Sequence, residues 1–148
     1  MLFGSDRNNL RKLWFEVYRK AQAGEPLTAL EEQIKAVIAL HPEYHKALAQ
    51  PERYAMQDYL PEFGEVNPFL HMGLHMGLRE QLSTDRPAGI AALYAQACLR
   101  FGDKHVAEHM LMDGLAEALW QAQRSGTMPD EQRYLQSIRS RLEHGGGT

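Results

Sequence analysis

The sequence predicts an all-α fold, a single-domain bundle of about six or seven helices, on three observations. Apolar residues recur every three or four positions over long stretches, helix-capping residues mark the ends of those stretches, and no segment alternates apolar and polar residues for long. A chain of 148 residues with 44% apolar side chains can bury one sizeable core and is short for two ordinary domains. We therefore expect one domain over residues 1–144 and a disordered glycine-rich tail over residues 145–148.

Two helices are expected before Pro42. The first starts near Asp6 and stops at Gly24. The second starts after Thr28, because Thr28 and Glu31 have the spacing of a capping box, in which each residue's side chain bonds the other's backbone. The second helix ends before Pro42, since the residue that precedes a proline is driven out of the helical conformation. A short helix is expected next, over residues 42–49.

The central helix is the most apolar of the chain. It is expected to start at Asn67 and Pro68, a capping side chain followed by proline at the first helical position, and to run to about Leu82. Its apolar residues face nearly every direction, which is typical of a helix inside a bundle. Gly73 and Gly77 lie four residues apart and predict a closely packed neighbouring helix.

Three further helices complete the expected bundle. They run from Pro87 to Phe101, from Lys104 to about Arg124, and from Pro129 toward the tail, with Gly102-Asp103 and Ser125-Gly126 between them.

Composition excludes several classes of protein. The single cysteine, Cys98, allows no intramolecular disulfide and no thiolate-rich zinc site, which favours the reducing cytoplasm. We expect no membrane insertion or secretion, because the sequence has no run of eighteen apolar residues and no basic segment leading into an apolar one. The net charge of -3 disfavours nucleic acid as a partner, and the basic residues of the first helix are expected to be a solvated face.

Six of the seven histidines form three pairs with a spacing of four residues. Random placement would give roughly 0.3 such pairs. On a helix, residues four apart have Cβ atoms about 5–6 Å apart, and two imidazoles can then bind one ion at about 2.0–2.1 Å. The pairs are His41 with His45, His71 with His75, and His105 with His109. They predict a divalent transition metal in the helical bundle, with zinc first and iron, nickel or manganese as alternatives.

The second and third pairs are expected to converge on one pocket. His41 precedes Pro42 and cannot share a regular helix with His45, so this pair is placed at the rim, where His41 would cap the short helix. Asp113 continues the ridge of His105 and His109 and is expected to be a ligand or a residue that orients His109. Glu108 is a candidate general base for a metal-bound water.

The long connection over residues 50–66 joins the first histidine pair to the second. Irregular connections of this length in compact domains are often lids or pocket walls. We expect Tyr54, Tyr59 and Phe63 to lie over the histidines.

Several runs of the sequence resemble a small bacterial family known only as a domain of unknown function, family 1841. They are His41-Pro42-Glu43-Tyr44-His45, Asn67-Pro68-Phe69-Leu70-His71 continuing to His75, His105-Val106-Ala107-Glu108-His109, and Trp120-Gln121-Ala122-Gln123-Arg124. The resemblance covers nearly the whole chain and implies a complete natural domain. The family has no assigned activity, so the resemblance implies no catalytic residue.

Two functions stay open from the sequence. One is a metal site, either catalytic in a hydrolase or oxidoreductase, or structural or sensing. The other is a non-enzymatic protein-interaction module in which the histidines are structural core residues and methionines line an adaptable groove. The H-x-x-E-H run at residues 105–109 matches certain zinc peptidases, but few residues follow it to supply their distant third ligand. The sequence names neither a small-molecule substrate nor a protein partner.

Overall fold

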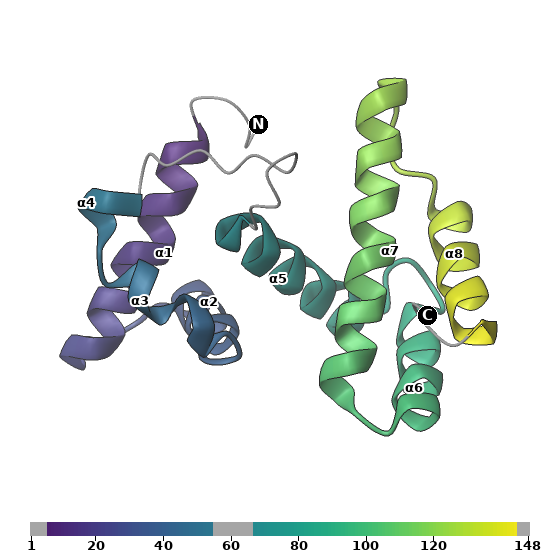
Figure 1. Cartoon of the computed structure of the whole chain (residues 1–148), viewed down its shortest axis with the longest axis horizontal. Helices are drawn as coiled ribbons and strands as arrows, with labels where there is room; N and C mark the ends of the chain where they lie inside the picture. The colour runs from purple at the N-terminus through teal and green to yellow at the C-terminus, as the bar shows by residue number, and fades with distance from the viewer. Residues whose placement is uncertain (1–5, 55–66, 145–148) are drawn as a thin grey trace. The chain divides into compact units, whose positions relative to one another are not determined.

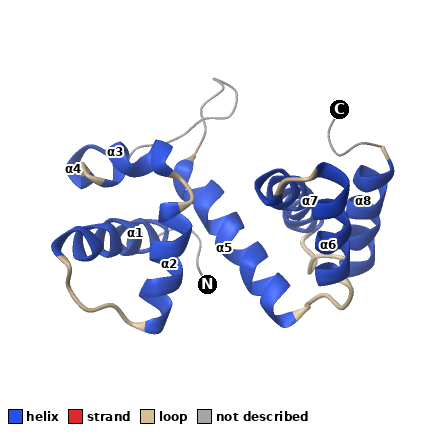
Figure 2. Ribbon diagram, turned by 90° about the horizontal axis from the view of Figure 1, so that it is seen from below, coloured by secondary structure: helices blue, strands red, loops and turns tan. Residues whose placement is uncertain are grey.

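The computed structural model describes residues 6–54 and 67–144, and within these ranges the chain forms helices and no strand (Figures 1 and 2). The elements are α1 (Asp6–Ala23), α2 (Ala29–Ala39), the 3-10 helix η1 (Pro42–Tyr44), α3 (His45–Leu48), α4 (Pro51–Tyr54), α5 (Pro68–Thr84), α6 (Ile90–Phe101), α7 (Lys104–Ser125) and α8 (Glu131–Glu143). The all-α prediction is confirmed. The four-residue helix α4, which was not predicted, brings the α-helices of the described residues above the expected six or seven, whereas α3 lies within the short helix expected over residues 42–49. In the described part of the chain, no helix combines the length and apolarity needed to cross a membrane.

Capping residues set the helix ends as the sequence predicted. Gly24 follows α1 with a φ of 70°, a left-handed conformation that favours glycine. At the start of α2, Thr28 Oγ1 accepts a hydrogen bond from the Glu31 amide at 3.2 Å, and Glu31 Oε1 accepts one from the Thr28 amide at 2.9 Å. This reciprocal pair is the predicted capping box. Asn67 Oδ1 likewise accepts the first amides of α5, from Phe69 at 2.9 Å and Leu70 at 3.1 Å.

Helix α6 starts at Ile90, three residues later than Pro87, where the sequence placed its beginning. The carboxylate of Asp85 accepts hydrogen bonds from the amides of Gly89 at 3.2 Å and Ala91 at 3.0 Å. Gly89 has a φ of 101°. A left-handed residue and an aspartate that binds the incoming amides therefore make residues 87–89 a turn, and the helix begins after it.

The chain divides into two compact units, Met1–Met76 (unit 1) and Gly77–Thr148 (unit 2), and the division falls within α5. Each unit is described by itself. The prediction of one domain over residues 1–144 stays a prediction. The expected disorder of residues 145–148 concerns residues outside the described ranges.

The core of unit 1 combines α1, α2, α3 and the first half of α5. Its buried apolar residues are Trp14, Phe15, Val17, Ile34, Val37, Ile38, Leu48, Phe69 and Met72. The guanidinium of Arg11, 2% exposed, lies 4.9 Å from the centre of the Phe69 ring. Lys20 on α1 and the buried Glu31 on α2 form an ion pair of 2.9 Å.

Unit 2 contains the second half of α5 together with α6, α7 and α8, and the last three helices pack against one another (Figure 1). The closest approach of helices at a glycine is at Gly114 on α7, where an added Cβ would lie 3.3 Å from Ile138 Cγ1 on α8. The prediction of close packing at Gly73 and Gly77 is wrong for the described residues. A Cβ at Gly73 would meet none of their atoms within 4 Å, and one at Gly77 would only touch Leu115 at 4.0 Å.

Candidate functional site

Three histidines gather inside unit 1. His41 and His75 are both fully buried, and Nε2 of His41 lies 2.9 Å from Nδ1 of His75, within hydrogen-bond distance. The His71 ring meets the His41 ring edge-on, with centroids 4.7 Å apart and an interplanar angle of 87°. Buried polar groups are almost always hydrogen-bonded, and the contact between His41 and His75 gives each of these two buried imidazoles a partner.

Two neighbouring elements place these rings. His71 and His75 are one turn apart on α5, so they share a face of that helix. His41 follows the end of α2 and leaves the helical conformation, with φ -128° and ψ 64°, because Pro42 comes next. His41 occupies the cap position of η1, as expected, but its side chain makes no capping hydrogen bond. The ring is instead turned inward, so His41 lies at the centre of the cluster and not at its rim.

Glu43 is the carboxylate partner of this cluster. Its Oε2 lies 3.1 Å from Nδ1 of His41, and its side chain is 55% exposed. Partial burial raises the pKa of Glu43, but the hydrogen bond from His41 lowers it, and the net pKa is below the ordinary value. Since an ionised carboxylate only accepts hydrogen bonds, Nδ1 of neutral His41 is the donor. Nε2 of His41 then accepts from Nδ1 of His75. The result is a chain of hydrogen bonds from buried His75 to the surface.

Tyr44 borders the same cluster. Its ring stacks on His41 with centroids 5.5 Å apart and lies 6.0 Å from the ring of His71. Burial raises the pKa of the Tyr44 hydroxyl, with a smaller contribution from Glu43. Tyr44 and Glu43 were not predicted as site residues. The only signal in the sequence was their position between His41 and His45.

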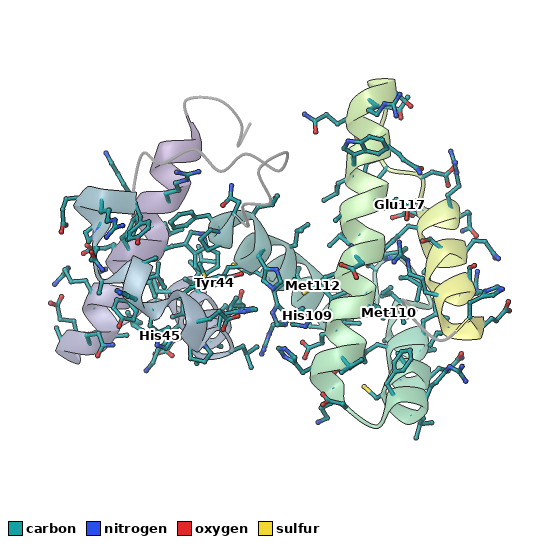
Figure 3. The ribbon with its side chains drawn as sticks, in the orientation of Figure 1. Tyr44, His45, His109, Met110, Met112 and Glu117 are labelled. Carbon is teal, nitrogen blue, oxygen red and sulfur yellow. The ribbon has the colours of Figure 1, made fainter. Side chains whose placement is uncertain are left out.

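His45 is directed elsewhere in unit 1. Its Nε2 lies 2.9 Å from the carbonyl oxygen of Ile38, and its ring lies 5.6 Å from that of Tyr18. Figure 3 labels His45 and its neighbour Tyr44 on the short helical segments. The spacing of four between His41 and His45 therefore does not reflect a shared helical face. This agrees with the expectation from Pro42 that the two residues cannot belong to one regular helix.

The third histidine pair lies in unit 2, on the first two turns of α7. The rings of His105 and His109 have centroids 4.1 Å apart. Nδ1 of His109 donates to the backbone carbonyl of His105 at 2.8 Å, and this bond helps to orient the ring. Asp113 is exposed one turn further along. Convergence of this pair with the histidines of unit 1 stays a prediction.

Two other carboxylates of α7, those of Glu117 and Glu108, interact with residues of unit 2. Glu117, labelled in Figure 3, accepts a hydrogen bond from Arg141 of α8 at 2.7 Å. Glu108, the candidate general base, is half-buried and adds to the raised pKa of Tyr94, which burial chiefly causes. Among the residues that the structure describes, no group of three or more His, Cys, Asp or Glu side chains is arranged to hold a metal ion.

The predicted lid falls mainly on residues 55–66, which include Tyr59 and Phe63 and lie outside the described ranges. Tyr54 is described and packs against the apolar core of unit 1.

Comparison with known proteins identifies a family. No curated protein and no solved structure matches the chain. The family described as a domain of unknown function, DUF1841, matches residues 6–140, and the chain therefore belongs to this family.

Proposed function

We propose that unit 1 binds a divalent transition metal through His41, His75 and His71. The observation that carries this proposal is the pair of fully buried imidazoles whose nitrogens, His41 Nε2 and His75 Nδ1, face each other at 2.9 Å. Imidazole nitrogen is a common ligand for zinc, copper, iron and nickel. Two such nitrogens aimed at one point, with a third imidazole beside them, supply the chemistry that these ions require.

The spacing of the two nitrogens fits a shared ion after a small adjustment. With metal–nitrogen bonds of about 2.0–2.1 Å, nitrogens 2.9 Å apart subtend about 90° at the ion, and a separation of about 3.3 Å gives the tetrahedral angle. The rings would thus separate by roughly 0.4 Å. The hydrogen on Nδ1 of His75 would move to its Nε2. His71 would rotate to bring one of its nitrogens to the ion, because in the present arrangement only the nitrogens of His41 and His75 are directed at one point.

Glu43 strengthens the case for a metal over an ordinary buried histidine pair. Histidines that bind metals usually donate their second ring N–H to a carboxylate, a carbonyl or a water, which fixes the tautomer and increases ligand basicity. His41 makes this arrangement, with Nδ1 on Glu43 and Nε2 directed into the cluster. Three protein ligands would leave a fourth position for water or substrate, as in catalytic zinc sites.

Zinc is the first choice of metal, with iron, nickel and manganese as alternatives. Nitrogen ligands suit zinc, iron and nickel, and manganese prefers oxygen donors. The single cysteine, Cys98, lies in unit 2 and belongs to no disulfide. We propose the cytoplasm as the compartment, because a reducing environment suits a chain with one thiol.

Binding of Co²⁺ to the full chain tests the proposal, because its visible spectrum reports coordination by nitrogen. We expect one ion per chain at this site, lost in His75→Ala and in His41→Ala. His45→Ala is the matched control, since that ring binds the Ile38 carbonyl and should leave the spectrum unchanged. Unchanged Co²⁺ binding in folded His75→Ala would overturn the proposal.

The second candidate is a protein-interaction module in which the histidines are structural. The observation that favours it is the chain Glu43–His41–His75, which gives both nitrogens of His41 a partner without an ion. Exposed apolar residues on unit 2 would supply a contact surface, among them Leu119, 42% exposed, and Trp120, 55% exposed. If chelators leave thermal stability unchanged and no divalent ion binds to unit 1, this candidate replaces the first.

A further inference from the structure

We propose that His105 and His109 form a second, solvent-accessible site for a borderline divalent cation within unit 2. The two residues lie at positions i and i+4 of α7, His105 is exposed, and His109 is half-buried. Their ring centroids are 4.1 Å apart. Two imidazoles on one ion at about 2.0–2.1 Å bring their centroids to roughly 4.5–5 Å, so only a slight opening of the pair is needed.

The hydrogen bond of His109 prepares it as a ligand. Nδ1 donates to the carbonyl oxygen of His105 at 2.8 Å, which places the hydrogen of the neutral ring on Nδ1 and the lone pair on Nε2. A histidine that binds a metal through one nitrogen commonly donates its other N–H to a carbonyl in this way. The same contact holds the His109 side chain along the helix toward His105, so part of the side-chain entropy is lost before an ion binds.

The first turn of a helix carries partial positive charge, which disfavours a cation. Asp103 offsets this effect. Its carboxylate accepts hydrogen bonds from the amides of His105 at 2.7 Å and Val106 at 3.2 Å and brings a full negative charge to the helix start. Asp113 adds negative charge on the same face. It lies eight residues after His105, about 12 Å along the axis at 1.5 Å per residue, so it is not a ligand to an ion between the two rings.

The ligand set points to Cu²⁺, Ni²⁺ or Zn²⁺. Two neutral imidazoles, with water in the remaining positions, should bind Cu²⁺ more tightly than either Ni²⁺ or Zn²⁺. The exchange of water at an exposed site should make this ion labile. Unit 2 would hold it whether or not unit 1 binds a metal, since each ligand set comes from one unit.

Titration of Ni²⁺ into the full chain, followed by calorimetry, provides the first test. We expect one Ni²⁺ per chain to bind at this site, more weakly than the ion of unit 1. Its binding should disappear in the double variant His105→Ala/His109→Ala and persist in His75→Ala. Asp113→Asn should retain it with reduced affinity. Two results would overturn the proposal: an unchanged number of bound ions in the double variant, or a single ion that is lost in both the double variant and His75→Ala.

Paramagnetic Cu²⁺ gives a second readout on the unaltered chain. At substoichiometric Cu²⁺, we expect the amide resonances around residues 104–110 of α7 to broaden. Broadening that spares these residues would contradict a site at His105 and His109, even if the double variant failed to fold. If an ion binds at His105 and His109 but none binds at the histidines of unit 1, the proposed function is wrong and the proposed site in unit 2 is supported.

Discussion

His41 and His75, 34 residues apart in the sequence, are joined through Nε2 and Nδ1 at 2.9 Å in the interior of unit 1. Neither ring is exposed to solvent. The contact ties the end of α2 to α5, and each imidazole satisfies a buried polar atom of the other. Removal of either ring therefore takes a buried hydrogen-bond partner away from the other.

This contact predicts a loss of stability even without metal. In the presence of a chelator, we expect His75→Ala to reduce the free energy of unfolding by about 1–3 kcal/mol, the usual penalty for an unsatisfied buried polar group. Chemical denaturation with urea measures the change. His105→Ala is the control, because that side chain is exposed and its loss should change stability by less than about 0.5 kcal/mol. Equal stabilities of the two variants would contradict the role of the His41–His75 bond.

Glu43→Gln should weaken metal binding without abolishing it. The glutamine side chain of this variant can still accept a hydrogen bond from His41, but it lacks the charge that raises the basicity of the ring. Loss of such a partner typically reduces metal affinity by about 10–100-fold. Competition with a chromophoric chelator measures the change. Glu52→Gln is a suitable control, since Glu52 is an exposed residue of α4, and it should bind metal like the wild type. Wild-type affinity in Glu43→Gln would contradict the role of Glu43.

The lowered pKa of Glu43 also predicts a dependence of stability on pH. A carboxyl group whose pKa is lower in the folded state stabilises the protein above its unfolded pKa, and this stabilisation disappears as the pH falls through the folded pKa. The effect should be modest, because the side chain is 55% exposed and solvent screens its charge. In the presence of a chelator, the difference in free energy of unfolding between wild type and Glu43→Gln should therefore decrease as the pH falls from about 7 to about 3. A difference that grows over this range would have the wrong sign.

The capping box of α2 can be tested by removing its hydroxyl. Thr28→Ala deletes the acceptor of the Glu31 amide, and loss of such a cap typically destabilises a protein by about 1 kcal/mol. Thr28→Ser keeps the hydroxyl and should stay within a few tenths of a kcal/mol of the wild type. Thermal unfolding of the two variants provides the comparison. If the serine and alanine variants are equally stable, the hydroxyl does not stabilise α2.

Most of the helical fold could be predicted because its signals are local. Thr28 with Glu31, Asn67 with Pro68, and Gly126 after α7 each specify a helix end within a few residues. The start of α6 was missed because the bonds from Asp85 to the amides beyond Pro87 compete with the ordinary preference of proline for a first helical turn.

The candidate site was only partly predictable. Spacing on α5 identified His71 and His75, but a spacing of four also linked His41 to His45, which the fold directs to different partners. The bond between His41 and His75 depends on how α2 and α5 pack, which periodicity along one helix does not encode. Glu43 was missed for the same reason. Its role depends on the rotation of His41 after Pro42 breaks the helix.

Gly114 provides the last prediction, because two opposing effects act on Gly114→Ala. Alanine favours a helix over glycine by about 1 kcal/mol. Its Cβ would lie 3.3 Å from Cγ1 of Ile138, a fully buried residue with little room to move, and overpacking of this kind costs about 1–3 kcal/mol. We expect a net loss of stability on urea denaturation. Gly73→Ala, where a Cβ meets no described atom within 4 Å, should instead stabilise the protein by about 0.5–1 kcal/mol. A gain in both variants would show that α7 and α8 tolerate the added methyl group.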